Sequence, residues 1–415
     1  MKIQRRAFLR TALGATATTV LSSCGRSSRS FVAANSASPG PLPSPDLSGI
    51  EHVVVVMMEN RSFDHFLGWL PNADGRQAGL SYADQTGAIQ NTYHLAGDFT
   101  GCGHIQPDHS YDGGRIQYDA GKMDGFLRSG NDIYSIGYYQ EQDLTFFGAL
   151  ARQYTTLDRY FCSFMGPTFP NRIFLHAAQT DRTSNTDDVC QLETIWDRLS
   201  EAGVSARAYS MYLALWGSEY ADITHSYDDY LSDAAAGQLP AVSFVDPPYS
   251  AITGAVDDHP FADIRNGDAF LSQTYHALVN SPCWPKSVLI VTFDEWGGFF
   301  DHVPPPRVVA PNATDTDLID GCALLGLRVP TVIASPFSMG SPLFPRVNSA
   351  VFDHTSVLKL IEWRWNLRSL TTRDASDEIG NLASVLDFAR PRTALPALPV
   401  VVPGPKSPCD VSVSD

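Results

Sequence analysis

The chain has 415 residues, with 45 acidic and 29 basic side chains and a formal net charge of -16 at pH 7. This length allows two or three average domains, or one large α/β domain with insertions, and composition does not separate these options. The acidity argues against a nucleic-acid partner, because such binding needs a basic patch and none appears as a run. It does not exclude a small phosphorylated substrate that is reached through a metal ion.

The first residues have the pattern of an export signal. Paired arginines followed by Phe-Leu within residues 4–10 are typical of a twin-arginine signal, and residues 11–21 are a weakly apolar stretch too short to span a bilayer. A twin-arginine route means folding in the cytoplasm before export, which suits a protein that must acquire its metal selectively. We therefore expect export to the outer face of the cytoplasmic membrane, the cell envelope or the medium.

The Leu-Ser-Ser-Cys sequence at the end of this stretch resembles a bacterial lipobox, whose cysteine becomes the lipidated N-terminus. On this interpretation residues 1–23 are a lipoprotein signal and Cys24 anchors the protein to a membrane. The alternative is ordinary signal cleavage near Ala33 or Ala37, which would discard Cys24. Residues 24–47 are rich in Ser, Ala and Pro, and are expected to be a flexible tether in either case.

Between residues 48 and 390, apolar strand patterns alternate with helical patterns. Such alternation is typical of an α/β fold with a mostly parallel central sheet and helices on both faces. A Gly-, Asp- and Tyr-rich region from about 72 to 140 predicts long loops, and residues 391–415 form a Pro-rich tail that is expected to be irregular. The predicted strands are 50–58, 205–209, 241–245, 287–293 and 329–335, and the predicted helices are 143–154, 173–179, 190–202, 266–279 and 355–365.

Two of these strands end in side chains that favour hard metal ions. Strand 50–58 is followed by Glu59-Asn60, and strand 287–293 is followed by Asp294-Glu295. Open α/β sheets build their active sites at the carboxyl ends of their strands, so the two pairs suggest one metal ion held between them.

A third segment lies between the two acidic strand ends. Gly166-Pro167-Thr168 forms a turn before a predicted helix, which places the Thr168 hydroxyl at a helix N-terminus, where the dipole favours an anion. That position suits a nucleophile that attacks phosphorus. The alternative is that Thr168 merely caps the helix.

Together these motifs resemble the phosphoesterase family, which contains bacterial phospholipases C, plant non-specific phospholipases C and some bacterial acid phosphatases. The match runs in order from about residue 50 to 366, so we expect residues 48–390 to be the catalytic domain. The motifs are Glu59 to His65, Asp108-His109-Ser110, Lys122 to Phe126, Thr168 to Arg172, Asp258-His259-Pro260, Asp294-Glu295 with Gly297-Gly298, and Asp301 to Pro304.

The resemblance implies an alkaline-phosphatase-like α/β fold with one divalent metal ion, either Ca, Mg, Mn or Zn, near a hydroxyl nucleophile. The metal would lower the pKa of the Thr168 hydroxyl, which would attack in line to give a phospho-threonine that water then hydrolyses. The implied metal ligands are Glu59, Asn60, Thr168, Asp294 and Glu295.

Histidines are expected to contact the phosphoryl oxygens or the leaving group. His109, His259 and His302 are the candidates for catalysis, while His225 and His354 are weaker candidates. His302 and His354 also lie in shared motifs, but each could instead support a neighbouring site residue or have a purely structural role. Arg172 could bind a phosphate oxygen, although a salt bridge that fixes its loop explains it equally well.

Two features depart from the family pattern. Many members carry His after the Asp-Glu pair, whereas this chain has Trp296, which removes one possible phosphate contact. The C-terminal β-domains of larger bacterial phospholipases C have no room here, so lipid binding is expected from the catalytic domain or the lipid anchor.

Three functions compete on the sequence alone. Thr rather than Ser at the nucleophile position favours a phospholipase C that hydrolyses phosphatidylcholine-like lipids to diacylglycerol and a phosphorylated head group. A broad acid phosphatase acting on monoesters would use the same metal and threonine. A non-enzymatic surface lipoprotein is disfavoured, because a decayed protein would have lost metal ligands and all five are present.

Cysteine content is compatible with disulfides. Six cysteines remain after Cys24, an even number in a chain expected to be exported, but the pairing cannot be deduced from the sequence.

The lipobox predicts that the exported protein is membrane-associated through Cys24. Cys24→Ala should release it into the soluble fraction, which fractionation and immunoblotting would detect. A wild-type protein that is already soluble after export would leave the twin-arginine signal standing and remove the anchor.

Overall fold

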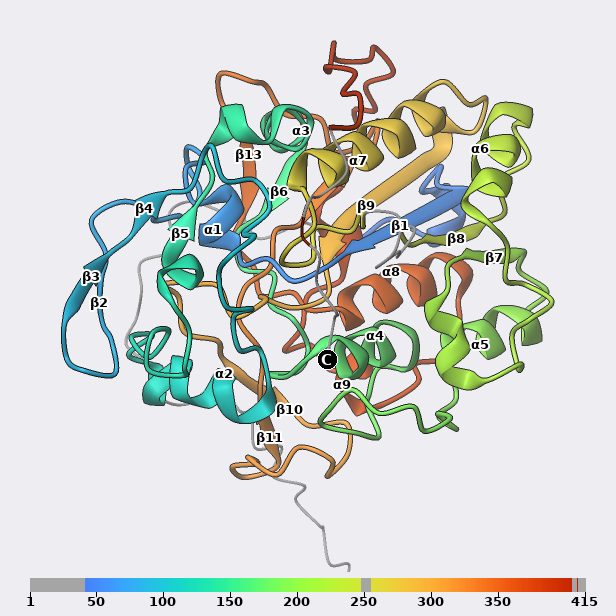
Figure 1. Ribbon diagram of the computed structural model, residues 1–415. Helices are drawn as coiled ribbons and strands as arrows, with labels where there is room; N and C mark the ends of the chain where they lie inside the picture. The colour runs from blue at the N-terminus through green and yellow to red at the C-terminus, as the bar shows by residue number, and fades with distance from the viewer. Residues whose placement is uncertain (1–41, 248–254, 405–408, 410–415) are drawn as a thin grey trace, which may run out of the picture.

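The computed structural model describes residues 42–247, 255–404 and 409 (Figure 1). The predicted signal, Cys24 and most of the predicted tether lie outside the described residues. Among the residues that are described, no helix combines the length and apolar character needed to cross a membrane.

A seven-stranded sheet forms the centre of the molecule, in the order β13-β6-β12-β9-β1-β8-β7. Neighbouring strands run parallel except around β12, which is antiparallel to both β6 and β9. The predicted α/β class with a mostly parallel sheet is therefore confirmed. The strands are β1 (His52–Met58), β6 (Thr155–Leu157), β7 (Ala206–Tyr209), β8 (Val242–Val245), β9 (Ser287–Phe293), β12 (Val332–Ala334) and β13 (Arg346–Asn348).

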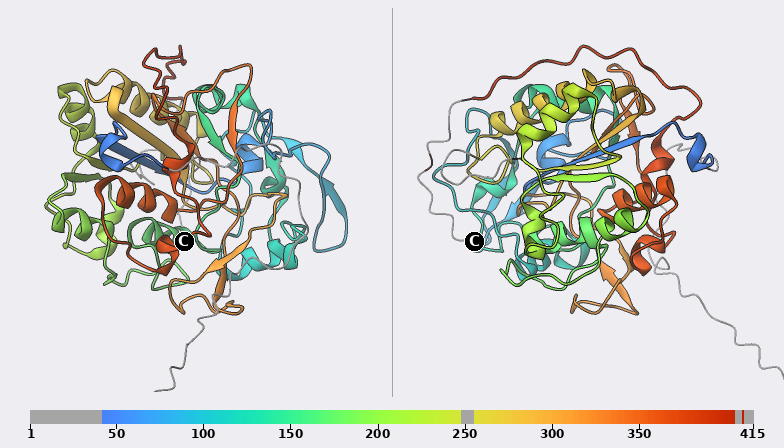
Figure 2. Two further views of the ribbon diagram at one scale, coloured as in Figure 1. Left: turned by 180° about the vertical axis from the view of Figure 1, so that it is seen from behind. Right: turned by 90° about the vertical axis from the view of Figure 1, so that its right-hand side faces the viewer.

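Helices cover both faces of this sheet, as Figures 1 and 2 show. One face carries α3 (Thr145–Gln153), α6 (Tyr227–Ala236) and α7 (Ile264–Val279). The other carries α4 (Thr168–Ala177), α5 (Ile195–Glu201), α8 (Thr355–Trp365) and α9 (Thr372–Ala375). Two-sided cover explains why β9 is buried at every residue and β1 at every residue after His52.

The remaining elements lie mostly outside the sheet and its helices. The region from 72 to 140 is largely irregular, as predicted, but it contains a hairpin, one α-helix and two short 3-10 helices. These smaller elements are α1 (Phe63–Leu67), α2 (Tyr111–Tyr118), β2 (Ser81–Ala83), β3 (Ile89–Asn91), β4 (Tyr93–His94), β5 (Gly137–Tyr138), β10 (Arg307–Val309) and β11 (Cys322–Leu324).

Several predicted boundaries shift in the structure. Helix α4 begins at Thr168 rather than at residue 173. Helix α5 begins only at Ile195, because Thr194 caps it: the Thr194 hydroxyl accepts from the Trp196 amide, and the Asp197 carboxylate accepts from the Thr194 amide. The strand predicted at 329–335 is the short β12. Helix α6 and strands β6 and β13 were not predicted.

The C-terminal segment has no regular structure in its described residues, as expected, yet it packs back onto the body of the protein. Leu398 and Val401 contact the core, and a disulfide joins Cys102 to Cys409. Three of the described cysteines have free thiols and are buried: Cys162, Cys190 and Cys283.

A buried ionic network joins the two chain segments that follow β1 and β9. The Arg328 guanidinium lies 3.1 Å from an Asp64 carboxylate oxygen and 2.9 Å from one of Asp301. His302 Nδ1 lies 2.5 Å from the other Asp64 oxygen, and its Nε2 lies 3.2 Å from Asp74. Because Asp64 lies in α1, just after Glu59-Asn60, and Asp301 follows Asp294-Glu295, the network fixes the two segments that carry the predicted ligands relative to each other.

This network should make stability depend on pH through His302. Burial alone would lower the pKa of His302, but the hydrogen bonds that its ring donates to the Asp64 and Asp74 carboxylates raise it to about 9, above its usual 6.5. Since the folded-state pKa is the higher one, the stabilisation is complete below about pH 6.5 and is lost as pH rises through about 9.

We expect urea unfolding to show a decline in the free energy of unfolding of the wild type between pH 6.5 and 9. His302→Gln, which keeps a polar side chain but cannot be charged, should be less stable at pH 6.5 and should lack this part of the decline. Equal pH dependence in the two proteins would contradict the ionic role of His302.

Candidate active site

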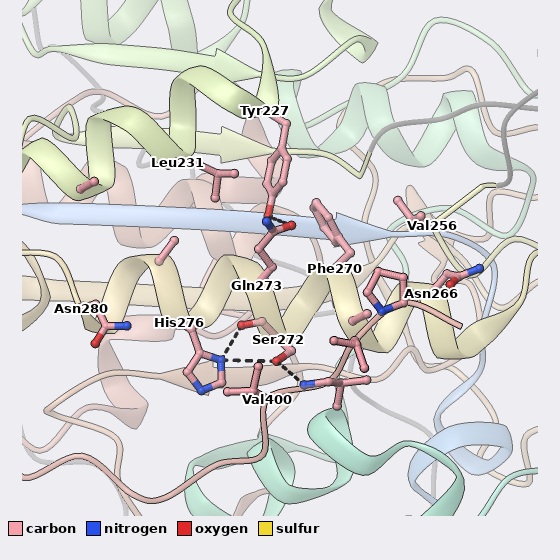
Figure 3. Close-up of a pocket in the computed structure, with 16 residues that line it drawn as sticks. Tyr227, Leu231, Val256, Asn266, Phe270, Ser272, Gln273, His276, Asn280 and Val400 are labelled. Carbon is pink, nitrogen blue, oxygen red and sulfur yellow. Dashed lines mark hydrogen bonds between the residues drawn. The ribbon is translucent and has the colours of Figure 1, made fainter. Parts of the chain in front are cut away.

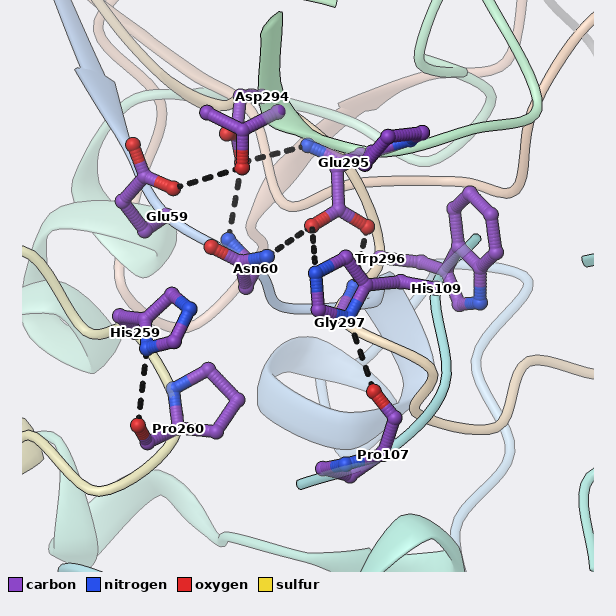
Figure 4. A network of polar contacts seen from close by, with 12 residues as sticks. Glu59, Asn60, Pro107, His109, His259, Pro260, Asp294, Glu295, Trp296 and Gly297 are labelled. Carbon is purple, nitrogen blue, oxygen red and sulfur yellow. Dashed lines mark hydrogen bonds and ion pairs between the residues drawn. The ribbon is translucent and has the colours of Figure 1, made fainter. Parts of the chain in front are cut away.

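The four strand-end ligands predicted from the sequence lie together in the structure (Figure 4). Strands β1 and β9 pair in parallel with Met58 opposite Phe293, so the residues that follow both strands emerge side by side. The Asn60 amide donates to an Asp294 carboxylate oxygen at 2.9 Å, and the Asn60 side chain donates to Glu295. The predicted cluster therefore forms across two neighbouring strands.

The turn after each strand adopts a left-handed conformation that its residues tolerate. Asn60 has φ of 58°, which Asn accepts more readily than most residues, and Gly297 has φ of 63°. A Cβ on Gly297 would lie 2.1 Å from the Asn60 carbonyl oxygen. Only glycine therefore lets the two turns approach this closely.

Glu59 is held by different partners at its two carboxylate oxygens. Arg172 Nη2 and the Tyr212 hydroxyl donate to Oε1 at 2.6 and 2.5 Å, whereas the Thr168 hydroxyl donates to Oε2 at 3.3 Å. Burial would raise the pKa of Glu59, but the Arg172 charge, followed by a hydrogen bond with Asp294 and the Tyr212 hydroxyl, holds it below its usual value. Glu59 is therefore an oriented carboxylate with one oxygen directed to Thr168.

Thr168 does not cap its helix. It is the first residue of α4, the N-cap is Pro167, and that cap has no side-chain hydrogen bond. The Thr168 hydroxyl is directed to Glu59 instead. The capping alternative does not describe this structure, and the expected position at a helix N-terminus does.

Arg172 connects two carboxylates below the site. Its Nη1 lies 2.6 Å from Asp246, its Nη2 bonds Glu59, and the side chain is 1% exposed. Both terminal nitrogens are thus engaged by protein carboxylates. The salt-bridge interpretation describes these contacts, and a bidentate phosphate contact would require breaking them.

His109 and His259 face the cluster from the same side (Figure 4). His109 Nε2 lies 4.0 Å from Glu295 Oε1, and the two imidazole rings are 6.4 Å apart. Each Nδ1 contacts a backbone carbonyl, of Pro107 at 2.8 Å and of Pro260 at 2.9 Å. Because a carbonyl only accepts, each Nδ1 carries the proton, and in the neutral ring Nε2 is the basic atom.

The remaining predicted histidines lie elsewhere. His354 is fully buried behind the site, where its Nε2 donates to the Asp294 carbonyl at 2.7 Å, and burial lowers its pKa to about 4. His302 contacts Asp64 and Asp74 in the Arg328 network. His225 packs its ring against Tyr209 at the end of β7. The structure thus gives His354 a supporting position behind Asp294. The contacts of His302 and His225 are with other residues than Glu59, Asp294 and Glu295.

Two side chains that orient Glu59 were not predicted from the sequence. Tyr212 bonds Glu59 directly, and Asp246 bonds the Arg172 that holds it. Asp246 directly follows β8, in the same way that Glu59 and Asp294 follow their strands, so the strand-end rule could have found it. Tyr212 begins the 3-10 helix Tyr212–Trp216 and had no pattern to mark it. Trp296, the residue after Glu295, is buried, and its indole nitrogen donates to Gln117 at 2.7 Å.

The electrostatics of the cluster fit a bound cation. Asp294 and Glu295 are fully buried, and burial together with the neighbouring carboxylates raises the pKa of both well above the usual range. Asp294 Oδ2 and Asn60 Oδ1 are buried without a hydrogen-bond partner among the described residues. Unpartnered carboxylate and amide oxygens are the donors that a hard or borderline divalent ion prefers.

A second group of potential ligands does not fit as well. Asp64, Asp301 and His302 offer ligand atoms within 4.8 Å of one another. The Arg328 guanidinium, however, bonds both of these carboxylates, so their charge is already compensated. The Glu59 and Asp294 cluster is the better candidate for the metal centre.

The comparison with protein families decides the assignment. The model of the phosphoesterase family matches residues 50–228 and 217–368, which is most of the chain. The chain belongs to the phosphoesterase family. It is therefore a hydrolase that acts on phosphoric ester bonds, as the resemblance implied.

Curated relatives agree with this assignment. Non-specific phospholipase C6 of Arabidopsis thaliana is 31% identical over 402 residues, covering 86% of this chain and 76% of the relative. Phospholipase C B of Mycobacterium tuberculosis is 31% identical over 457 residues, covering 88% and 85%.

Among solved structures, the chain is similar to a protein in the alkaline phosphatase superfamily from Vibrio parahaemolyticus. The two share 10% identity with a TM-score of 0.39, over 81% of this chain and 72% of the other. A likeness this weak carries no argument about the site or its chemistry.

Proposed function

We propose that this phosphoesterase is a divalent-metal-dependent phospholipase C, which hydrolyses phosphatidylcholine-like lipids to diacylglycerol and a phosphorylated head group. The observation that carries the proposal is the Thr168 hydroxyl, 3.3 Å from the oriented Glu59 carboxylate and beside the buried acidic cluster. The relatives named phospholipase C support the diester substrate.

The metal would be held by the oxygens of Glu59, Asn60, Thr168, Asp294 and Glu295. When bound, it would neutralise phosphate charge and favour the ionised form of the hydroxyl that attacks. Its identity among Ca, Mg, Mn and Zn is not part of the proposal.

The protein's own residues account for the nucleophile. Arg172 and Tyr212 occupy Glu59 Oε1, so Oε2 is the oxygen that receives the Thr168 proton. Thr168 Oγ1 attacks phosphorus in line, and the bond between phosphorus and the diacylglycerol oxygen breaks as the new bond forms. The product of this step is a phospho-threonine ester that carries the head group.

His109 and His259 handle the remaining protons. One imidazolium gives its Nε2 proton to the departing diacylglycerol oxygen, and the neutral ring then accepts a proton from the attacking water. Water breaks the bond between phosphorus and Thr168, Glu59 returns its proton to the Thr168 oxygen, and the phosphorylated head group is released. The carbonyls of Pro107 and Pro260 hold each ring with Nε2 as the exchanging atom.

The threonine mechanism predicts opposite outcomes for two substitutions. Thr168→Ser keeps the attacking oxygen and should retain measurable hydrolysis of phosphatidylcholine vesicles. Thr168→Val keeps the shape and removes the oxygen, so it should lose on the order of 10³-fold or more. Circular dichroism should match the wild type in both variants. Activities are compared at saturating metal, because Thr168→Val also removes one of the proposed ligand oxygens.

The same purified samples should be assayed with p-nitrophenyl phosphate, to separate the diester from the monoester reaction. A wild type that hydrolyses only the monoester would replace the phospholipase by an acid phosphatase. A folded, metal-loaded Thr168→Val variant within tenfold of the wild type would make water, not Thr168, the nucleophile.

Metal content should respond in a graded way to changes around Glu59. Glu59→Ala and Asp294→Ala should remove tightly bound metal together with turnover. Tyr212→Phe removes only the hydroxyl that orients Glu59, so metal affinity or activity should fall about 10- to 100-fold. Elemental analysis after dialysis and metal titration would measure both effects.

Tyr154→Phe is the matched control, because the buried Tyr154 hydroxyl bonds Tyr275 on α7 at 2.8 Å rather than Glu59. Stoichiometric metal retained in both alanine variants would overturn the assigned site. Equal metal affinity in Tyr212→Phe and Tyr154→Phe would remove the orienting role of Tyr212.

A further inference from the structure

An apolar groove of about 860 Å³ lies between α6, α7 and the C-terminal segment (Figure 3). Leu231 of α6, with Ala269 and Phe270 of α7, forms two of its walls, and residues 400–403 form the third. No Lys, Arg, Asp or Glu is among the described residues that line it. The groove therefore offers contact to an uncharged, apolar ligand.

Three of the polar side chains in the groove have partners within the protein. The Tyr227 hydroxyl bonds Thr274 at 2.8 Å, and His276 Nδ1 lies 2.7 Å from the Ser272 carbonyl. The Ser272 hydroxyl accepts from the Val401 amide at 3.1 Å, which fastens the C-terminal segment along α7 (Figure 3). A ligand would thus gain little from hydrogen bonding and most from apolar contact.

One end of the groove lies next to a segment that contacts Glu59. Val256 lines it, and the carbonyl of the next residue, Asp257, accepts the Glu59 amide at 2.8 Å. The groove then follows α7 from Asn266 to Asn280, a helix rise of about 21 Å. Its course leads away from the phosphoryl site along a narrow apolar path.

The C-terminal segment ties this wall to the catalytic loop as well. Six residues beyond Pro403, Cys409 forms the disulfide with Cys102, which precedes His109 by seven positions. Val400 and Val402 are 76% and 78% exposed along the groove. Exposed apolar side chains beside an apolar groove are typical of a ligand-binding surface.

We propose that this groove binds an acyl chain of the lipid substrate, an inference that rests on the proposed phospholipase function. The phosphoryl group lies at the acidic cluster while one chain runs past Val256 along α7. A lipid that reaches this site must withdraw part of its chains from the bilayer, and the groove replaces the apolar contacts that those methylenes lose. The uncharged lining excludes the head group from the same path.

The test uses a pair of substitutions on α6 that differ in position by one residue. Ala235 lines the far part of the groove and is exposed, whereas Ala236 is equally exposed and is not among the lining residues. Ala235→Arg should block the long path, and Ala236→Arg is the matched control. Ala277→Trp, which fills the groove without adding charge, is a second blocking variant.

The first readout is the ratio of hydrolysis rates for dipalmitoyl- and dihexanoyl-phosphatidylcholine in the same detergent micelles. Both blocking variants should lower this ratio about tenfold or more, because only the longer chain reaches the blocked part, while Ala236→Arg should keep the wild-type ratio. The second readout is the binding of cis-parinaric acid, a fluorescent 18-carbon fatty acid, which should weaken about tenfold in the blocking variants alone.

The two readouts separate failure of the groove from failure of the proposed function. If the lipids are hydrolysed but neither the ratio nor fatty-acid binding differs between Ala235→Arg and Ala236→Arg, the groove inference is overturned. If no phosphatidylcholine is hydrolysed yet fatty-acid binding is lost only in the blocking variants, the groove stands and the phospholipase assignment falls. Absence of fatty-acid binding in the wild type also overturns the groove.

Discussion

The parallel pairing of β1 with β9 is the constraint on which the site depends. Its register places Met58 opposite Phe293, so the next residues of both strands converge and three carboxylates become buried within one cluster. Buried like charges are costly unless a cation compensates them. Arg172 lies 2.6 Å from Glu59 and 3.7 Å from Asp294, so a single guanidinium faces three carboxylates. The fold therefore concentrates negative charge at a place where a divalent ion and a phosphate ester can meet.

Support for this cluster comes from outside the two strands. Arg172 of α4 and Tyr212 of the 3-10 helix fix one oxygen of Glu59, and His354 holds the Asp294 carbonyl from behind. Arg328 clamps the segments that follow both strands through Asp64 and Asp301. These contacts restrict the ligand side chains before any ion binds, which is what a preorganised metal site requires.

The parts of this arrangement that follow local rules could be predicted from the sequence. Apolar runs predicted the central strands, and the strand-end rule placed Glu59, Asn60, Asp294 and Glu295 together. The capping box of Ser226 and Asp229 also marks the start of helix α6 in the sequence, although this helix was not predicted. Strand β12 was shorter than predicted because its apolar run continues as buried irregular chain on both sides.

Contacts between distant segments had no such signal. Both His302 and His109 lie in shared motifs and were candidates for catalysis. In the structure His302 belongs to an ionic network with Asp64, whereas His109 faces the acidic cluster. Nothing in spacing shows which way a side chain points across 238 residues, the separation of His302 from Asp64. The same holds for Tyr212, whose hydroxyl matters only because the fold carries a 3-10 helix over Glu59.

Rigid and irregular parts of the molecule thus contribute different things to the site. The sheet supplies the ligand cluster, because strand ends hold charged groups in fixed positions despite their mutual repulsion. The long irregular region supplies His109, and the Pro-rich C-terminal segment supplies a groove wall that is joined to the same region by the Cys102–Cys409 disulfide. In the proposed binding mode, substrate choice depends on segments whose position is set by a cross-link and a few hydrogen bonds, while the proposed chemistry depends on the sheet. Loops of this kind tolerate change more readily than a sheet core, so relatives with the same acidic cluster can differ in the esters they accept.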